Sequence, residues 1–243
     1  MSKLYKTDAI VLKQIKYGES SLIVKMFTKE KGLRSFMVGS VRGKRSRAAM
    51  FQIMNQLDVL AYESGPDKLN RIKEFRLKTI YRSIGSDMIK NAVGIFMIDL
   101  FLQSVKEQET NLELYDFMTE QLDHLDSTEH QYGMMPLTFT LNLSKHLGFF
   151  PQNNYSAIDD RFSILDGAFT QNNQKQENKY LLSPELSQCL SGLLSQIDND
   201  QEMTTLPKTL RTDLLNKLIN FYKVQLEGFK GLKSIEVIQT LFG

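Results

Sequence analysis

The 243-residue chain has only one cysteine and three histidines, and these shortages limit the kinds of site that it can build. Cys189 cannot form an internal disulfide and has no second cysteine for a zinc site, so we expect a half-buried structural thiol. His124, His130 and His146 show no ligand spacing with partner residues. The sequence therefore predicts neither a metal site nor a disulfide framework.

Long hydrophobic runs are missing as well. The most apolar run, residues 92–102, is too short to span a bilayer and contains Asp99. The first residues carry charges where a signal peptide would need an uninterrupted apolar stretch. The hydrophobic content of 42% nevertheless supports a real core. We expect a folded cytoplasmic protein with no membrane partner.

Charge is divided unevenly along the chain. Residues 1–82 carry 18 Lys and Arg against seven Asp and Glu, whereas residues 83–243 carry 12 against 21. The whole-chain net charge of +2 therefore hides a basic N-terminal part and an acidic remainder. A basic module of this kind favours a polyanion partner, and nucleic acid is the leading one, although a merely solvated charge run is the alternative.

The hydrophobic period changes near residue 80. Before that point, short β-like segments rich in Val, Ile, Phe and Tyr are separated by turn signals at residues 17–20, 31–32 and 64–67. Five such strands with basic, Gly-containing connections predict a small closed barrel of the oligonucleotide/oligosaccharide-binding (OB) type, because closure removes exposed edges. The expected strands are residues 9–13, 22–27, 33–41, 57–62 and 72–81.

After residue 83 the apolar spacing becomes helical. Pro136 lies in the first turn of one expected helix that ends at Gly148, and Ser183 is the expected N-cap of another, with Pro184 at its first position. A polar stretch at about residues 149–182 interrupts the helices, and residues 161–170 within it are predicted to form a small hairpin. The predicted fold class is thus α+β and multidomain, with an OB-type barrel over residues 1–82 and a mainly α-helical domain over residues 83–243.

Four N-terminal segments, taken together, are typical of one protein family. Residues 10–12, 17–24, 27–33 and 39–47, taken in order and spacing, closely resemble the RecO family of bacterial recombinational repair proteins. Residues 228–234 also resemble this family, so the resemblance covers both ends of the chain.

The resemblance implies a DNA repair factor that is not an enzyme and has no catalytic residues. Members of this family bind single- and double-stranded DNA, anneal complementary strands and, with RecR, help load RecA onto DNA coated with single-stranded-DNA-binding protein. It also implies a nucleoid-associated location. The charge pattern agrees in kind, because Lys and Arg on a barrel track phosphates while exposed aromatics stack on bases.

Candidate DNA-binding residues follow from charge and position. Four cations share one short Gly-flanked arc at residues 42–47, and Tyr17 beside Gly18 is the only aromatic candidate for stacking. Phe27, Phe36 and Tyr62 alternate with other apolar residues and are expected in the core. The full set of candidates is Lys13, Tyr17, Lys25, Arg34, Arg42, Lys44, Arg45 and Arg47.

For partner binding, Lys145, Lys230 and Lys233 are candidates, since the tail of the single-stranded-DNA-binding protein is typically acidic. One departure from the family concerns metal. Many RecO proteins carry a four-cysteine zinc site, but the matching stretch here, residues 149–182, contains neither Cys nor His, so we expect no cofactor.

Two alternatives stay open. One is an OB protein directed to RNA, and the other is a nucleic-acid-processing enzyme with an unrecognised site. Residues 39–44 look superficially like a phosphate-binding loop, but the glycines are separated by three residues and Arg45 replaces the required Ser or Thr. Annealing without nucleotide or metal would favour the repair factor over both alternatives.

Overall fold

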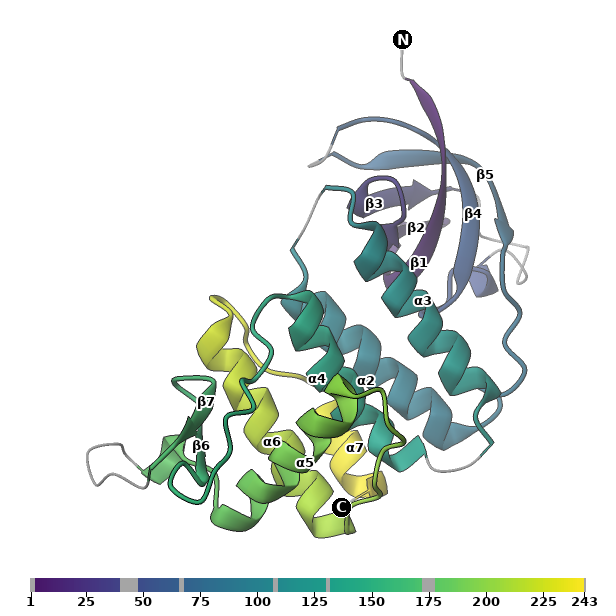
Figure 1. Ribbon diagram of the computed structural model, residues 1–243. Coiled ribbons are helices and arrows are strands. Elements are labelled where there is room, and N and C mark those ends of the chain that lie inside the picture. The colour runs from purple at the N-terminus through teal and green to yellow at the C-terminus, as the bar shows by residue number, and fades with distance from the viewer. Residues whose placement is uncertain are drawn as a thin grey trace. The chain divides into compact units, whose positions relative to one another are not determined.

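The computed structural model describes residues 3–39, 48–65, 68–106, 109–129, 132–171 and 178–242. The chain divides into two compact units (Figure 1). One contains residues 1–98 and 105–127, and the other contains residues 99–104 and 128–243. Each unit is described by itself below.

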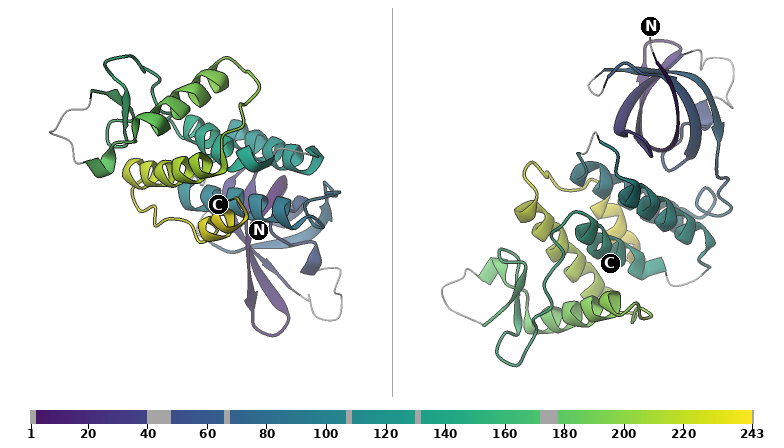
Figure 2. Two further views of the ribbon diagram at one scale, coloured as in Figure 1. Left: turned by 90° about the horizontal axis from the view of Figure 1, so that it is seen from below. Right: turned by 45° about the horizontal axis from the view of Figure 1, so that its top comes forward.

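The first unit is built on a closed five-stranded barrel. Its strands are β1 (Leu4–Tyr17), β2 (Ser21–Thr28), β3 (Gly32–Val38), β4 (Gln56–Tyr62) and β5 (Asn70–Leu77). They are ordered β1-β2-β3-β5-β4, and β1 closes the barrel by pairing with both β2 and β4 (Figure 2, right). The barrel is of OB type, which confirms the predicted fold class and all five expected strands.

Alternation of side chains sets the barrel interior. On β2, Leu22, Val24 and Met26 are buried in the core cluster, whereas Ile23 and Lys25 between them are only partly buried and lie on the outer side. The β1–β2 ladder has one irregularity between Val11 and Lys13, a β-bulge that shifts the register. The core positions of Phe27 and Phe36 confirm their prediction, but Tyr62 is only half-buried and is one residue out of phase with the core residue Ala61.

Two helices follow the strands. Helix α2 spans Met88–Ser104, and α3 spans Leu112–Ser127. Residues 88–98 of α2 and all of α3 belong to the same compact unit as the barrel, so this unit extends beyond the expected boundary at residue 82. The reason is packing over long sequence distances: Tyr115 of α3 is stacked on Phe27 of β2, with ring centroids 6.2 Å apart.

A carboxylate on α3 holds the segment between β5 and α2. Asp126 accepts hydrogen bonds from the backbone amides of Arg82, Ser83 and Ile84, at 2.8–3.0 Å. Burial alone would raise the pKa of Asp126, but these donors and the Ser83 hydroxyl outweigh it and hold the pKa below its ordinary value. Lys90 adds a 2.9 Å hydrogen bond to the Asp126 carbonyl.

The second unit is mainly helical, as predicted. Its helices are η1 (Tyr132–Met134), α4 (Met135–His146), η2 (Asn178–Tyr180), α5 (Pro184–Asp198), α6 (Lys208–Gln225) and α7 (Ile235–Phe242). Pro136 lies in the first turn of α4, and the Ser183 hydroxyl caps α5 by accepting a hydrogen bond from the Leu186 amide. Both sequence-predicted helix starts are confirmed. Within the described ranges, no helix has the length and apolar character needed to cross a bilayer.

A small hairpin of β6 (Arg161–Ser163) and β7 (Ala168–Thr170) confirms the expected one. Phe162 is fully buried, with its ring 5.3 Å from that of Phe169 and 5.7 Å from that of Phe221. Phe149 and Tyr222 extend this aromatic cluster, with ring centroids 4.9 Å apart. The described part of the chain contains no group of three or more His, Cys, Asp or Glu side chains that could hold a metal ion.

Candidate nucleic-acid interface

The outer face of β1, β2 and β3 brings three sequence-predicted residues together. In the strand registers, Lys13 is opposite Lys25, which is opposite Ser35, and two residues along the strands Ile15 is opposite Ile23, which is opposite Met37. Tyr17 and Ser21 close this face at the turn. We call this surface the β1–β3 face. In OB-type barrels, the face of strands 2 and 3 and the adjacent loops bind oligonucleotides.

Lys13 and Lys25 form a like-charged pair across two strands. Burial lowers the pKa of Lys25, and the nearby charge of Lys13 lowers it further. In the described part of the chain, no carboxylate forms an ion pair with either lysine. Like charges placed directly opposite each other destabilise a sheet, so this pair favours binding of an anion between or over the two ammonium groups.

Tyr17 is placed for contact with a ligand. Its side chain is 54% exposed at the end of β1, and the next residue, Gly18, has a φ of +58° that starts the turn into β2. The turn thus holds the tyrosine ring at the tip of a hairpin rather than in the core. A ring in this position is available for stacking on a base.

Arg34 does not join this face. It is opposite Met26, a core residue, and so lies on the other side of β3 from Ser35 and Met37. It lies near Glu63 instead: the hydrogen bond from Lys31, at 2.6 Å, is the main cause of the lowered pKa of Glu63, and the charge of Arg34 lowers that pKa slightly further. The four cations of the expected arc, Arg42, Lys44, Arg45 and Arg47, lie outside the described residues, which resume at residue 48. That segment follows β3 directly along the chain.

Four residues of the β1–β3 face are not among the candidates predicted from the sequence. Arg71 at the start of β5 is exposed and is the parallel-sheet partner of Met37, so it adds a cation at the edge of the face. Ile15, Ile23 and Met37 contribute apolar side chains. The alternation of residues 13–17 about the Gly18 turn contained the signal, because a fixed turn also fixes which residues pair across it.

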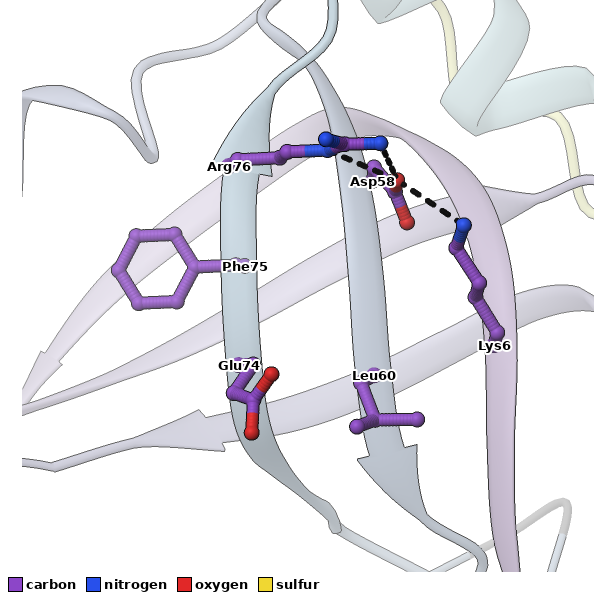
Figure 3. Close-up of a pocket in the computed structure, with 6 residues that line it drawn as sticks. All are labelled: Lys6, Asp58, Leu60, Glu74, Phe75 and Arg76. Atoms are coloured by element: carbon purple, nitrogen blue, oxygen red, sulfur yellow. Dashed lines mark hydrogen bonds and ion pairs between the residues drawn. The ribbon is translucent and has the colours of Figure 1, made fainter.

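The face formed by β1, β4 and β5 is electrostatically different. Asp58 forms ion pairs with Lys6 at 3.3 Å and Arg76 at 2.7 Å, beside a pocket of about 380 Å³ that Phe75 also lines (Figure 3). Burial would raise the pKa of Asp58, but hydrogen bonds from Arg76 and Lys6 outweigh it and lower the pKa. This face therefore offers cations that are already paired.

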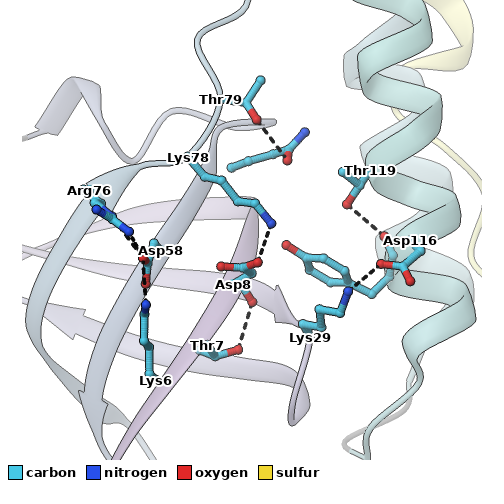
Figure 4. A network of polar contacts seen from close by, with 12 residues as sticks. Lys6, Thr7, Asp8, Lys29, Asp58, Arg76, Lys78, Thr79, Asp116 and Thr119 are labelled. Atoms are coloured by element: carbon cyan, nitrogen blue, oxygen red, sulfur yellow. Dashed lines mark hydrogen bonds and ion pairs between the residues drawn. The ribbon is translucent and has the colours of Figure 1, made fainter.

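The same network continues toward α3. Lys78 pairs with Asp8, and Lys29 pairs with Asp116 at 2.9 Å (Figure 4). The first pair joins β1 to the residue after β5, and the second joins the turn after β2 to α3, so these basic side chains are neutralised within the fold. Lys13, Lys25 and Arg71 on the β1–β3 face, by contrast, form no ion pair with a carboxylate in the described residues.

The helical unit contains a separate basic pocket of about 550 Å³. Lys223, Lys230 and Lys233 line it together with the apolar side chains of Ile219 and Leu232. Among the three predicted partner-binding lysines, Lys230 and Lys233 therefore share one pocket, whereas Lys145 does not line it. Lys145 instead lies 3.6 Å from the Asp198 carboxylate and over the ring of Phe150.

Comparison with known proteins identifies relatives over nearly the whole chain. Two family models match, "Recombination protein O N terminal" over residues 1–81 and "Recombination protein O C terminal" over residues 85–234. A "DNA repair protein RecO" from Christiangramia forsetii is 31% identical over 99% of this chain and 100% of the relative. The protein of the same name from Flavobacterium psychrophilum is 32% identical over 98% of each chain, and that from Bacteroides fragilis is 27% identical.

Proposed function

The chain belongs to the RecO family of DNA repair proteins, and from this premise we propose that it binds single- and double-stranded DNA through the β1–β3 face and anneals complementary strands. We further propose that it acts with RecR to help load RecA onto strands coated with single-stranded-DNA-binding protein, in association with the nucleoid. The proposed activity includes no covalent step and needs no metal cofactor, so the protein acts as a binding factor rather than an enzyme.

One observation supports this proposal most directly. Lys13 and Lys25 face each other without a carboxylate partner in the described chain, whereas Lys6, Arg76 and Lys78 on another face are each paired with a carboxylate. A cationic face next to a neutralised one binds a polyanion in a defined place and releases its counterions. Annealing is slowed by repulsion between two polyanionic strands, and a cationic surface that holds one strand lowers that barrier.

Strand annealing with purified protein is the direct test. We expect complementary single strands to pair faster than they do spontaneously, without ATP or divalent metal, both bare and coated with the cognate single-stranded-DNA-binding protein. Variants with Lys13→Gln and Lys25→Gln should slow annealing, while Lys6→Gln should not. A folded protein that binds DNA but does not accelerate annealing would contradict the proposal. Preference for RNA, or metal-dependent cleavage, would instead support one of the two alternatives.

For the coated strands we propose docking of the acidic tail of the single-stranded-DNA-binding protein in the pocket lined by Lys223, Lys230 and Lys233. Three ammonium groups in one pocket complement an acidic tail. In the described residues, no carboxylate side chain lines this pocket.

Binding of a labelled tail peptide tests this placement. The double variant Lys230→Ala/Lys233→Ala should weaken peptide binding about tenfold, because it removes two charges from the pocket. Lys208→Ala, an exposed lysine at the start of α6, is the matched control and should have no effect. A loss caused by Lys145→Ala, but not by the double variant, would move the docking site to the end of α4.

A further inference from the structure

A row of apolar side chains crosses the β1–β3 face. Ile15 is 49% exposed, and Ile23 and Met37, its neighbours on the next two strands, are half-buried. The outward positions of a barrel strand are usually polar, and one exposed isoleucine alone needs no explanation. Apolar residues at the same level of three adjacent strands form a patch instead, and such a patch indicates a ligand.

The surroundings of the row define the chemistry of that ligand. Lys13 and Lys25 lie on one side of it, the exposed ring of Tyr17 lies on the other, and Arg71 borders its β3 end. A ligand that fits must therefore present anionic groups beside apolar faces. Single-stranded nucleic acid has this composition, with phosphates along the chain and unpaired bases next to them. In a duplex, the faces of the bases are stacked against each other and cannot reach the row.

We infer that the row of Ile15, Ile23 and Met37 binds the faces of unpaired bases and makes the protein prefer single-stranded over double-stranded DNA. The inference rests on the proposed function, because it requires that the β1–β3 face bind DNA. It adds a separate role for the apolar row. The lysines attract phosphates of either form of DNA, whereas the apolar side chains gain contact only where bases are free.

Paired affinity measurements test the inference. The probes are a fluorescently labelled oligothymidine of about 30 nucleotides and a labelled duplex of the same length, at the same salt concentration. In Ile15→Thr/Ile23→Thr, the residues remain β-branched and suited to a strand, but apolar surface is lost. We expect affinity for the single strand to fall about tenfold and affinity for the duplex to stay within about twofold.

Two further variants keep the test independent of folding. Ile15→Tyr adds a ring at the exposed end of the row and should tighten single-strand binding about fivefold while leaving duplex binding unchanged. Ile80→Thr is the matched control, because Ile80 is 81% exposed but lies in the segment after β5. It should change neither affinity. Thermal unfolding of each variant checks that the fold is intact.

The outcomes separate this inference from the proposed function. If the wild-type protein binds neither probe, the proposed function fails and the inference fails with it. If the wild type binds, but the double variant loses both affinities equally or neither, only the inference is overturned. Unchanged DNA affinities together with loss of self-association would assign the row to an interface between two copies of the chain.

Discussion

Asp8 on β1 is directly opposite Asp58 on β4, so the barrel places two carboxylates side by side just as it places Lys13 beside Lys25. The two like-charged pairs have different outcomes. Lys6 and Arg76 pair with Asp58, and Lys78 pairs with Asp8, which neutralises the acidic pair within the fold. The lysine pair has no such compensation in the described residues. Compensation of the lysines is therefore left to a ligand.

The first prediction concerns this lysine pair. Lys13→Gln/Lys25→Gln should flatten the plot of log affinity for single-stranded DNA against log salt by about 1.4, since each phosphate contributes about 0.7. The same change should raise the free energy of unfolding by about 0.5 kcal/mol, because it removes a repulsive cross-strand pair. Lys6→Gln is the control for the salt plot. An unaltered slope would show that the pair does not contact phosphates.

The second prediction concerns the basic arc that follows β3. Replacing Arg42, Lys44, Arg45 and Arg47 together by Ala should weaken binding of single-stranded DNA about equally for all sequences and flatten its salt plot by up to about 2.8. Titrations with two unrelated DNA sequences at several salt concentrations measure both effects. A sequence-dependent loss would indicate contacts with bases instead of phosphates.

The third prediction concerns Asp126. Asp126→Asn should lower the free energy of unfolding by about 2 kcal/mol at pH 7, because the amides of residues 82–84 lose a charged acceptor. Asp116→Asn on the same helix breaks only the exposed pair with Lys29 and should lower the free energy of unfolding much less. Denaturant unfolding of both variants measures the difference.

The pH dependence of the same variant follows from the lowered pKa of Asp126. A carboxyl group with a pKa below its unfolded value of about 3.9 stabilises the folded state above that value, and its contribution is lost as the pH falls through the folded pKa. The advantage of the wild type over Asp126→Asn should therefore be constant near neutral pH and shrink below about pH 4. An advantage that persists at the lowest accessible pH would contradict this account.

The fourth prediction concerns the hairpin of β6 and β7. Purified protein should contain no stoichiometric zinc, and a chelator should leave the thermal midpoint unchanged. Phe162→Ala should instead destabilise the protein by about 3–5 kcal/mol, because Phe162 is fully buried between Phe169 and Phe221. Leu165→Ala in the same hairpin is the control, since Leu165 is 42% exposed. One tightly bound zinc ion per chain would refute the prediction.

The fifth prediction concerns fragments. A fragment of residues 1–127 should unfold cooperatively and keep most of the DNA affinity, because it retains the contacts of α3 with the barrel. A fragment of residues 1–82 should be less stable, since it lacks Tyr115 against Phe27 and Asp126 against the segment after β5. A folded fragment of either length that does not bind DNA would contradict the assignment of DNA binding to the barrel.

The strands and helix starts could be predicted because their causes are local. Apolar alternation, the Gly18 turn and the caps at Pro136 and Ser183 act over a few residues each. The stacking of Tyr115 on Phe27 joins residues far apart in the chain, so no local pattern predicted that α3 belongs with the barrel. Arg34 was included in the site on charge alone, whereas its side of β3 depends on the register with Met26.

The bulge between Val11 and Lys13 puts the two halves of β1 out of phase with each other. If Leu12 took a regular place in the ladder, Leu12, Gln14 and Lys16 would occupy the outer positions that Lys13, Ile15 and Tyr17 now hold. One unpaired residue thus decides whether the hairpin presents its cation, isoleucine and tyrosine outward. Deletion of Leu12 would leave Lys13, Ile15 and Tyr17 on the outer face. Deletion of any single residue within 13–17 would instead move the residues before it to the opposite face of the strand. This surface is therefore more sensitive to a deletion in β1 than to most substitutions.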